Sequence, residues 1–374
     1  MVIGIDASRA NTPDRTGTEW YSYYLLREFA RTAQNHHLVL YTREPLQDDL
    51  RAIAQHMDVR TLRWPPRRFW TQIRLSGEMV RHAPDVLFVP AHTIPIVHPP
   101  RTVTTLHDVG FERYPHLYGR FELAYHRWAA RFALRHARHV ITVSEFSKRE
   151  IVATIGADPN RITVIPLGYD TTQYRPDLPS EQIDRVTAQY GLTRDAYLFS
   201  IGRLEQKKNT RGLIEAYARA RGAANLPLVL AGTPGFGYDQ VTDAIRQLGV
   251  AAHVRQLGWI PQQDVPYLLA GARAFVFPSF YEGFGLPVLE SMATGTPVIA
   301  STAGAVPEVA GQAAILVDPS DTEQLGNALI RLINDRELRS VLRSRGLERA
   351  SAFRWSACAA ATLQILQSVA EHEA

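Results

Sequence analysis

Two glutamates, Glu282 and Glu290, frame a glycine-containing turn in the segment FVFPSFYEGFGLPVLESMATGTPVIAS. A helix is predicted to begin near Pro287, because proline fits the first helical turn, where its missing N–H is no loss. Gly283 and Gly285 allow the backbone to approach a ligand closely. Carboxylates accept hydrogen bonds from hydroxyl groups, and the start of a helix attracts anions. The turn therefore suits a ligand that carries both phosphate and vicinal hydroxyls, as a nucleotide-linked sugar does.

The amides at the start of this helix should contribute to such a site. The first N–H groups of a helix have no intrahelical acceptor, so those of Leu286, Val288 and Leu289 are expected to be free and to point at the ligand. An alternative interpretation remains open for each acid taken alone. Glu282 and Glu290 would then be ordinary helix N-terminal acids that interact favourably with the helix dipole, and the glycines would only shape the turn.

A second group of charged residues lies in SIGRLEQKKNTRGLIEAYARA, where a predicted strand runs into a loop with Arg203 and Lys208. Two cations at a strand end suit a diphosphate, because they neutralise its oxygens and stabilise the charge that grows on a departing nucleotide. No divalent metal should be essential, and the sequence has no Asp-x-Asp pair to hold one. The alternative, solvated loop charges, fits Lys207 better than either neighbour.

The elements that must position these residues follow from hydrophobic patterning. Predicted strands in the first half are VIGIDA, HLVLYT, DVLFVP, TVTTLHD and HVITVSEF, with a helix from Trp20 to Arg31. After a polar, proline-bearing connection at residues 166–195, the series restarts with AYLFSIGRL, LPLVLAG, HVRQLGWI, RAFVFPS, TPVIAS and AAILVD. Strands that are apolar throughout indicate parallel sheets covered by helices on both faces.

This pattern predicts an α/β protein with two doubly wound, Rossmann-like domains that face a central cleft. We place the first domain at residues 1–168 and the second at residues 169–354. The terminal helix, residues 355–374, should pack back on the first domain. In such sheets ligands bind at the carboxyl ends of the strands, where both charged groups lie.

Bulk properties limit the protein's location and partners. The 374 residues are 45% hydrophobic and 21% charged, with a net charge of +4, a mild basic bias that does not by itself select a partner. Cys358 is the only cysteine, which excludes an internal disulfide and a cysteine-built zinc site and suits a reducing compartment. The N-terminus lacks the features of a secretory signal, and no segment has the roughly 20 apolar residues that a spanning helix needs. A cytoplasmic protein is expected, with peripheral contact at the inner face of the membrane left open.

The motifs GRLEQKKN, LGWIPQQDVPYLLAGARAFVFPSFYEGFGLPVLE and GTPVIASTAGAVPEVAG resemble the retaining glycosyltransferases of family 4, which have the GT-B fold of two Rossmann-like domains. The resemblance covers most of the second domain and is highly specific in its Glu-x7-Glu element. The first domain resembles the family more loosely, through GIDASR, TLHDVG and VITVSEFSKREI.

The resemblance implies roles for the charged residues in the second domain. Glu290 should bind the ribose hydroxyls, Arg203 and Lys208 the diphosphate, and Glu282 the transferred sugar. The main chain near Ile260 is similar to the position that meets the nucleobase. The turn around the sugar is formed by Gly283, Phe284, Gly285 and Leu286.

Two residues of the first domain also match the family. Gly17 is similar to the loop that closes over the phosphates, although this sequence has Thr18 where many members have a second glycine. His107, which ends the run TVTTL, stands where similar enzymes place a histidine that faces the donor sugar. A strand-end histidine could hydrogen-bond the sugar or position the acceptor. The alternative is a capped structural histidine.

The implied activity is retaining transfer of a hexose from a nucleotide-diphosphate sugar to a glycan or lipid-linked acceptor, in cell-envelope or exopolysaccharide synthesis. No covalent nucleophile stands out, so catalysis would come from positioning and leaving-group stabilisation. Mannose from a guanine nucleotide is the first expectation for the donor and glucose from a uracil nucleotide the second, both by frequency in the family. No other cofactor is expected.

Acceptor recognition should fall to the first domain, where RWPPRRFWTQIRL combines cations with aromatic rings. These residues are Arg63, Trp64, Arg67, Arg68, Phe69, Trp70 and Arg74. In FELAYHRWAARFALRHARHV one helical face carries Arg127, Arg131 and Arg135, and another carries Phe121, Tyr125, Trp128 and Phe132. The favoured interpretation is a solvated arginine face and an aromatic core face. Contact with a membrane surface is the alternative.

Other functions are weighed against this one. A GT-B-like nucleotide-sugar epimerase or a glycan phosphorylase could also use two such domains, but neither predicts EGFGLPVLE together with GRLEQKK upstream. A non-catalytic binding protein is favoured only by the basic charge. A nucleic-acid partner is not expected, because the arginines are scattered and no recognition helix is evident.

Overall fold

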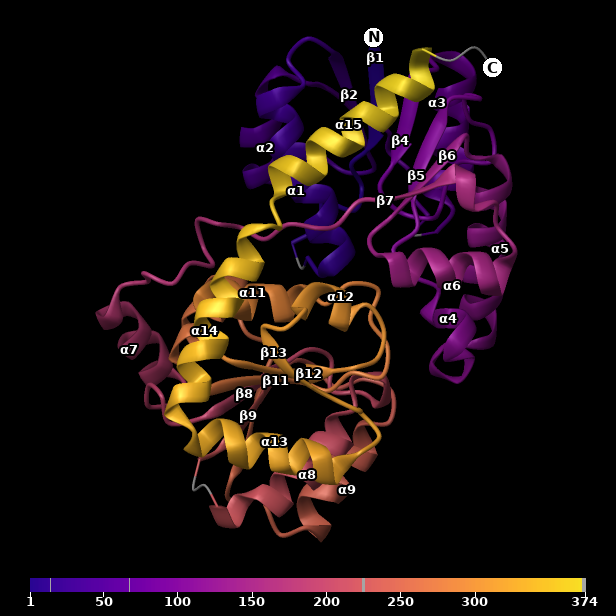
Figure 1. The fold of residues 1–374 in the computed structure, drawn as a ribbon. Helices are drawn as coiled ribbons and strands as arrows, with labels where there is room; N and C mark the ends of the chain where they lie inside the picture. The colour runs from indigo at the N-terminus through magenta and orange to yellow at the C-terminus, as the bar shows by residue number, and fades with distance from the viewer. Residues whose placement is uncertain (14, 67, 224–225, 372–374) are drawn as a thin grey trace. The chain divides into compact units, whose positions relative to one another are not determined.

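The computed structural model describes residues 1–13, 15–66, 68–223 and 226–371. These residues form two compact units (Figure 1). Unit 1 comprises Met1–Gly168 together with Arg354–Ala374, and unit 2 comprises Tyr169–Phe353. The C-terminal segment thus returns to the first unit after the chain has completed the second.

Unit 1 contains a parallel sheet of seven strands in the order β3-β2-β1-β4-β5-β6-β7. Every strand is short, and the central ones are buried along their whole length, as expected for a sheet covered on both faces. The strands are β1 Val2–Asp6, β2 His37–Thr42, β3 Asp58–Thr61, β4 Val86–Val89, β5 Thr102–Thr105, β6 His139–Thr142 and β7 Ile162–Val164. Its main helices are α1 Gly17–Thr32, α2 Asp48–Ile53, α3 Ser76–Arg81, α4 Gly110–Arg113, α5 Arg120–His136, α6 Glu145–Ile155 and α15 Trp355–Glu371.

Two helices from opposite ends of the chain pack together in unit 1. Tyr24 of α1 stacks on Trp355 of α15, with ring centroids 5.1 Å apart, and α15 also contacts β4, β5 and β6. Gly168 passes so close to this helix that an added Cβ would lie 2.1 Å from the backbone nitrogen of Trp355. Only glycine is tolerated there without a backbone shift.

The π-helix η2, Trp70–Leu75, with α3, α5 and α6, contributes to a second core layer of unit 1. Leu75, Met79 and Ala133 pack there with Val39 and Leu87 of the sheet. This layer fixes the position of the arginine- and aromatic-rich segments identified in the sequence.

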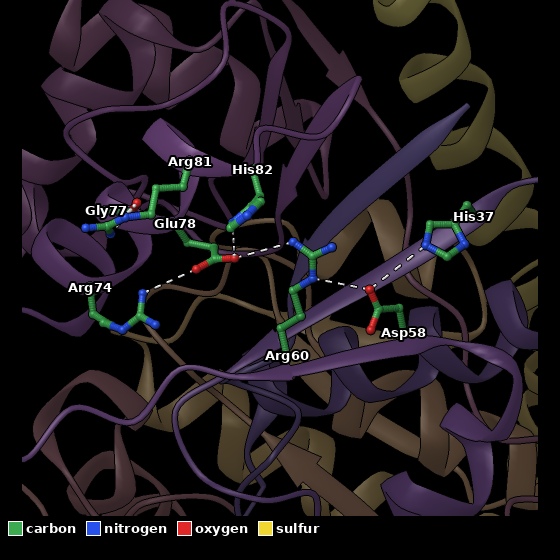
Figure 2. Close-up of polar contacts among 8 residues, drawn as sticks. All are labelled: His37, Asp58, Arg60, Arg74, Gly77, Glu78, Arg81 and His82. Carbon is green, nitrogen blue, oxygen red and sulfur yellow. Dashed lines mark hydrogen bonds and ion pairs between the residues drawn. The ribbon is translucent and has the colours of Figure 1, made fainter.

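A carboxylate network joins α3 to the edge of the sheet (Figure 2). The nearly buried Glu78 accepts from Arg60 of β3 at 3.3 Å, from Arg74 at 3.4 Å, and contacts His82 Nδ1 at 3.1 Å. Arg60 also reaches Asp58 at 3.2 Å. A single carboxylate therefore contacts side chains from β3, from η2 and from the end of α3.

Replacing Glu78 by alanine should lower the free energy of unfolding by roughly 1–3 kcal/mol, since three hydrogen bonds to a charged group are lost, although Arg60 keeps another carboxylate, Asp58. Denaturant unfolding followed by circular dichroism measures this change. Asp48→Ala, which removes an exposed ion pair with Arg51, should change the value by no more than about 0.5 kcal/mol. Equal effects of the two substitutions would refute the importance of the network.

Unit 2 contains a second parallel sheet, with six strands in the order β10-β9-β8-β11-β12-β13. The strands are β8 Leu198–Ile201, β9 Leu228–Ala231, β10 Val254–Gly258, β11 Ala274–Phe277, β12 Val298–Ser301 and β13 Ala314–Val317. The helices are α7 Ser180–Gln189, α8 Thr210–Ala220, α9 Tyr238–Gln247, α10 Val265–Gly271, α11 Leu286–Thr294, α12 Val306–Ala310, α13 Thr322–Asn334 and α14 Arg336–Ser351. Both units are thus doubly wound α/β structures, as the sequence predicts.

The polar segment at residues 166–195 is more than a connection. It contains α7, whose Gln182 accepts a hydrogen bond from Tyr267 of α10 at 2.6 Å. Gly271 of α10 makes room for Thr187, since an added Cβ would lie 2.7 Å from that side chain. Most of this segment therefore belongs to the packed structure of unit 2. No helix among the described residues combines the length and the apolar character needed to cross a membrane.

Candidate functional site

The strand order of unit 2 reverses between β8 and β11. Chain connections run from β8 to β9 on one side and from β11 to β12 on the other, and such a reversal opens a crevice at the carboxyl ends of the two strands. Lys208 follows β8 and Glu282 follows β11, and Lys208 Nζ donates to Glu282 Oε1 at 2.5 Å. The backbone N–H of Phe280 also donates to the carbonyl of Lys207 at 2.9 Å. The structure thus joins the two motifs at the switch point.

Arg203 lies at the same strand end, and a glycine clears the space for its side chain. A Cβ added to Gly235 would lie 2.6 Å from Cγ of Arg203. Gly232 runs against the carbonyl of Gly202 so closely that a Cβ would lie 1.9 Å from it. Arg203 remains exposed, whereas the Lys208 ammonium is partly buried and sits 5.4 Å from the Phe277 ring. Lys208 is therefore fixed at the crevice, whereas the exposed Arg203 side chain packs against Gly235 in the loop after β9.

The start of α11 differs in part from the prediction. Gly285 has a φ of 104° and precedes the helix, a conformation that favours glycine. The N–H groups of Val288 and Leu289 donate to the carbonyl of Gly285, at 3.0 and 3.3 Å. The expectation that these two amides are free is therefore wrong, because the first turn closes on its own N-cap. Within the described part of the chain, the amides of Phe284, Gly285 and Leu286 have no hydrogen-bond acceptor.

Glu290 lies one helical turn further along α11. Burial raises the pKa of Glu290 from 4.5 to about 8, against the opposing effect of a hydrogen bond from Tyr174. Tyr174 is itself buried and accepts from the side chain of Gln262 at 2.6 Å. Gln262 stands two residues beyond the buried Ile260, so this hydrogen-bond chain links Glu290 to the loop predicted to meet the base. Sequence analysis singles out neither residue: Tyr174 lies in the polar connection, and Gln262 lies within the motif LGWIPQQDVPYLL without a role assigned to it.

If Glu290 binds ribose, affinity for a nucleotide sugar should rise with pH, by up to tenfold per unit, until about pH 8. A carboxylate accepts two hydroxyls better than a protonated acid does, and the phosphates of a nucleotide sugar are diesters that stay charged. Isothermal calorimetry in buffers of different ionisation enthalpy should detect proton release at pH 7. The same raised pKa means that the contribution of Glu290 to stability falls as pH rises from 4.5 to about 8.

Glu290→Gln is the control for this pH dependence. The variant should bind the donor with an affinity that is nearly flat between pH 6 and 8.5. Proton uptake on binding, or an unchanged pH profile in the variant, would show that another group titrates.

In unit 1, the helix that begins at the predicted residue Gly17 contacts the predicted residue His107. Tyr21, one turn after the start of α1 at Gly17, packs edge-on against His107 with centroids 4.7 Å apart. His107 Nε2 lies 3.4 Å from the carbonyl of Pro90, and burial lowers the pKa of the imidazole. The imidazole is therefore mainly neutral at pH 7, and in the tautomer in which Nε2 donates to this carbonyl, Nδ1 can accept from a hydroxyl. A Cβ on Gly17 would meet no atom within 4 Å, so packing within the chain does not require glycine there.

A pocket of about 810 Å³ lies in unit 1 at the carboxyl ends of β1, β2 and β4. Cations, acids and aromatic rings share its wall, among them Arg9, Arg43, Arg68, Asp6, Glu122, Phe69, Trp70 and Tyr125. Three of the predicted acceptor residues therefore line one cavity. Trp64 lies nearby, where its indole N–H donates to the carbonyl of Arg68 at 2.9 Å. Arg67 lies outside the described residues.

The aromatic face of α5 is not the core face that the sequence favours. Alanines pack inward, since the buried residues of the helix are Ala129, Ala130 and Ala133. Phe121 and Trp128 keep 64% and 41% of their surface exposed. The small side chains allow the helix backbone to lie close to the rest of unit 1, which leaves Phe121 and Trp128 exposed, while Phe132 still packs against the core.

Among the described residues, no group of three or more His, Cys, Asp or Glu side chains could hold a metal ion. The site residues in unit 2 are cations, carboxylates and backbone amides.

Comparison with known proteins agrees with this geometry. The family model described as "Glycosyl transferases group 1" matches residues 183–349, and the one described as "Glycosyltransferase Family 4" matches residues 15–173. O-antigen chain mannosyltransferase B of Escherichia coli is 32% identical over 301 residues, covering 80% of this chain and 76% of that protein. The chain belongs to glycosyltransferase family 4. Its resemblance to that family is therefore confirmed, and its activity is that of a glycosyltransferase.

Other known proteins also resemble this glycosyltransferase. The MMP alpha-(1->4)-mannosyltransferase of Mycolicibacterium hassiacum is 33% identical over 238 residues, which are 62% of this chain and 54% of that protein. The crystal structure of Anabaena HepE with UDP and glucose superposes with a TM-score of 0.76 at 21% identity, covering 98% of this chain and 99% of that chain. WaaG, a glycosyltransferase involved in lipopolysaccharide biosynthesis, gives 0.75 at 17%, covering 98% and 99%. The predicted GT-B fold is confirmed.

Proposed function

We propose that this glycosyltransferase moves a hexose, with retention of anomeric configuration, from a nucleotide-diphosphate sugar to a glycan or lipid-linked acceptor in polysaccharide synthesis. The observation that carries the proposal is the pairing of Lys208 with Glu282 at the switch point of unit 2, beside the unoccupied amides at the start of α11. A diphosphate and a polyhydroxylated sugar need cations, donors and carboxylates side by side.

Each side chain would have a distinct part in the reaction. Arg203 and Lys208 would neutralise the diphosphate as its bond to the anomeric carbon breaks. Glu282 would hold sugar hydroxyls and Glu290 those of ribose. The acceptor oxygen would bond to the anomeric carbon on the face that the phosphate leaves, and the acceptor proton would pass to that phosphate. Charge stabilisation would come from the two cations without a divalent metal.

The donor we favour is mannose on a guanine nucleotide. Two relatives at 32 and 33% identity are named as mannosyltransferases, which supports the sugar. The HepE structure contains UDP and glucose, so UDP-glucose is the first donor to compare. The acceptor would bind to unit 1, at the pocket of about 810 Å³. A lipid-linked acceptor would make this a peripheral enzyme on the cytoplasmic side of its membrane.

The test is incubation of the full chain with radiolabelled GDP-mannose or UDP-glucose, with and without EDTA, after thermal-shift screening against GDP, UDP and ADP. Stabilisation by GDP and EDTA-resistant release of mannose, as a product or by slow hydrolysis, are expected. NMR of the product should show the anomeric configuration of the donor. Inversion at C2 of the donor sugar would instead identify an epimerase, and phosphate-dependent release of a sugar phosphate from a glycan would identify a phosphorylase.

A further inference from the structure

Exposed apolar side chains gather on one part of unit 1. The set is Phe69, Ile73, Ile96, Val97, Phe121 and Trp128, each at least 41% exposed. A soluble surface usually carries such residues singly, and a contiguous patch marks a surface that contacts something else. We call this set, together with the arginines of α5, the α5 face.

Hydrogen bonds and a ring contact bring together the three segments of the α5 face, which are η2, the loop after β4 and α5. Gln72 donates to the Tyr125 hydroxyl at 2.7 Å, which joins η2 to α5. The N–H of Val97 donates to Ser76 at 3.1 Å, which joins the loop after β4 to α3. His98 packs edge-on against Phe132 of α5 with centroids 6.2 Å apart. The elements that carry the exposed side chains are therefore neighbours on unit 1.

Helix α5 displays three stripes. Its alanines face inward, its aromatic residues repeat at intervals of three and four along one side, and its arginines follow a neighbouring side. Trp128 stacks on Phe132 with centroids 5.4 Å apart, so the aromatic stripe is continuous. The helix carries four arginines against one glutamate. Aromatic and cationic stripes that adjoin on an exposed helix are typical of helices that lie in a membrane interface.

The arginines of α5 differ in their availability. Glu112 holds Arg127 at 2.9 Å and Arg131 at 3.5 Å. Within the described ranges, Arg120 and Arg135 have no carboxylate within ion-pair distance. Their charge is therefore available to an external anion. An apolar protein partner would need the rings but not these two cations, whereas an anionic lipid surface uses both.

We propose that the α5 face docks on an anionic membrane surface, with the rings of α5 and Ile73 in the interface and Arg120 and Arg135 against lipid phosphates. Phe69 and Phe121 of the face also line the pocket of about 810 Å³, so docking would bring that pocket to the membrane that holds a lipid-linked acceptor. This use of the surface rests on the proposed function, whereas binding to the membrane does not.

Vesicle co-sedimentation of the full chain tests the proposal without any sugar substrate. The protein should bind vesicles that contain phosphatidylglycerol at least tenfold more tightly than vesicles of phosphatidylcholine alone, and salt should weaken that binding. The double variant Ile73→Ser/Trp128→Ser should bind both kinds of vesicle at least tenfold more weakly than the parent. Arg120→Gln/Arg135→Gln should lose affinity only for the anionic vesicles. Leu248→Ser/Val341→Ser, which alters exposed apolar residues of unit 2, is the matched control and should bind like the parent.

Three results would overturn the proposal. The first is no binding of the parent protein to anionic vesicles, and the second is unchanged binding in both α5-face variants. The third is a dimer in light scattering that becomes monomeric in Ile73→Ser/Trp128→Ser, which would make the face a self-association surface. Sugar transfer to a water-soluble acceptor should persist in these variants. Loss of vesicle binding with intact transfer, or the reverse, separates failure of this inference from failure of the proposed function.

Discussion

Replacing Lys208 by alanine is expected to lower kcat/KM for sugar transfer by about 10²- to 10³-fold. Lys208 is the partly buried cation at the switch point, and removing one preorganised group that stabilises transition-state charge has an effect of this size. The charge on the departing diphosphate grows as its bond to the sugar breaks, so kcat should fall more than donor affinity. Initial rates with a labelled donor, and donor affinity by calorimetry, give the two quantities separately.

Lys207→Ala is the matched control, because it removes the same charge from the adjacent residue of the same loop. It should retain activity within about threefold, since long-range effects of a partly exposed charge are screened by salt. Equal losses of activity in the two variants would mean that transfer depends on the total positive charge of the loop and not on the position of Lys208. Full activity of Lys208→Ala would exclude this lysine from the reaction.

Replacing Glu282 by alanine should lower kcat by about 10²-fold while the dissociation constant of the donor changes by less than about fivefold. Glu282 forms an ion pair with Lys208 and is proposed to bind the transferred sugar. If these interactions strengthen in the transition state, their loss lowers kcat more than donor affinity. Glu282→Gln keeps a hydroxyl acceptor but loses the ion pair, so its activity should fall between the parent and the alanine variant.

Glu215→Ala, which removes an exposed ion pair with Arg211 in the neighbouring helix α8, should leave both constants unchanged. A Glu282→Ala variant that loses donor affinity as strongly as activity would assign this acid to ground-state binding. Such a result would contradict the proposal that Glu282 acts mainly in transfer and Glu290 mainly in donor binding.

The sequence predicts the parts of the site that depend on local pattern. Lys208 and Glu282 each follow an apolar run, and the rule that parallel strands bind ligands at their carboxyl ends brings them to one edge. The same rule does not predict Tyr174, because this residue lies in a segment that the sequence indicates to be a connection. Its hydrogen bond to Glu290 depends on how unit 2 packs. A side chain that acts by positioning another residue need not stand at any regular sequence spacing from it, so no motif identifies it.

The misjudged features have equally specific causes. Periodicity identifies the aromatic stripe of α5 but not which stripe faces inward, and here the alanines do. The amides of Val288 and Leu289 bond to Gly285 because the first turn tightens, a detail of backbone geometry that composition does not encode. Strand β3 reads DVRT and has no fully buried residue, so it lacks the apolar run that marks the central strands. Strand β7 is apolar, ITV, but only three residues long, too short to stand out beside the connection that follows it.

The return of α15 to unit 1 has a consequence for biosynthesis. Residues 1–168 are translated before unit 2, yet helix α15, which contacts β4, β5 and β6, is translated after unit 2. Until then, Tyr24 lacks its stacking partner Trp355, and apolar surface on the nascent unit stays open to water. Unit 2, which is continuous in sequence, can fold before α15 is made. Unit 1 therefore begins to be translated before unit 2 but completes its fold after it.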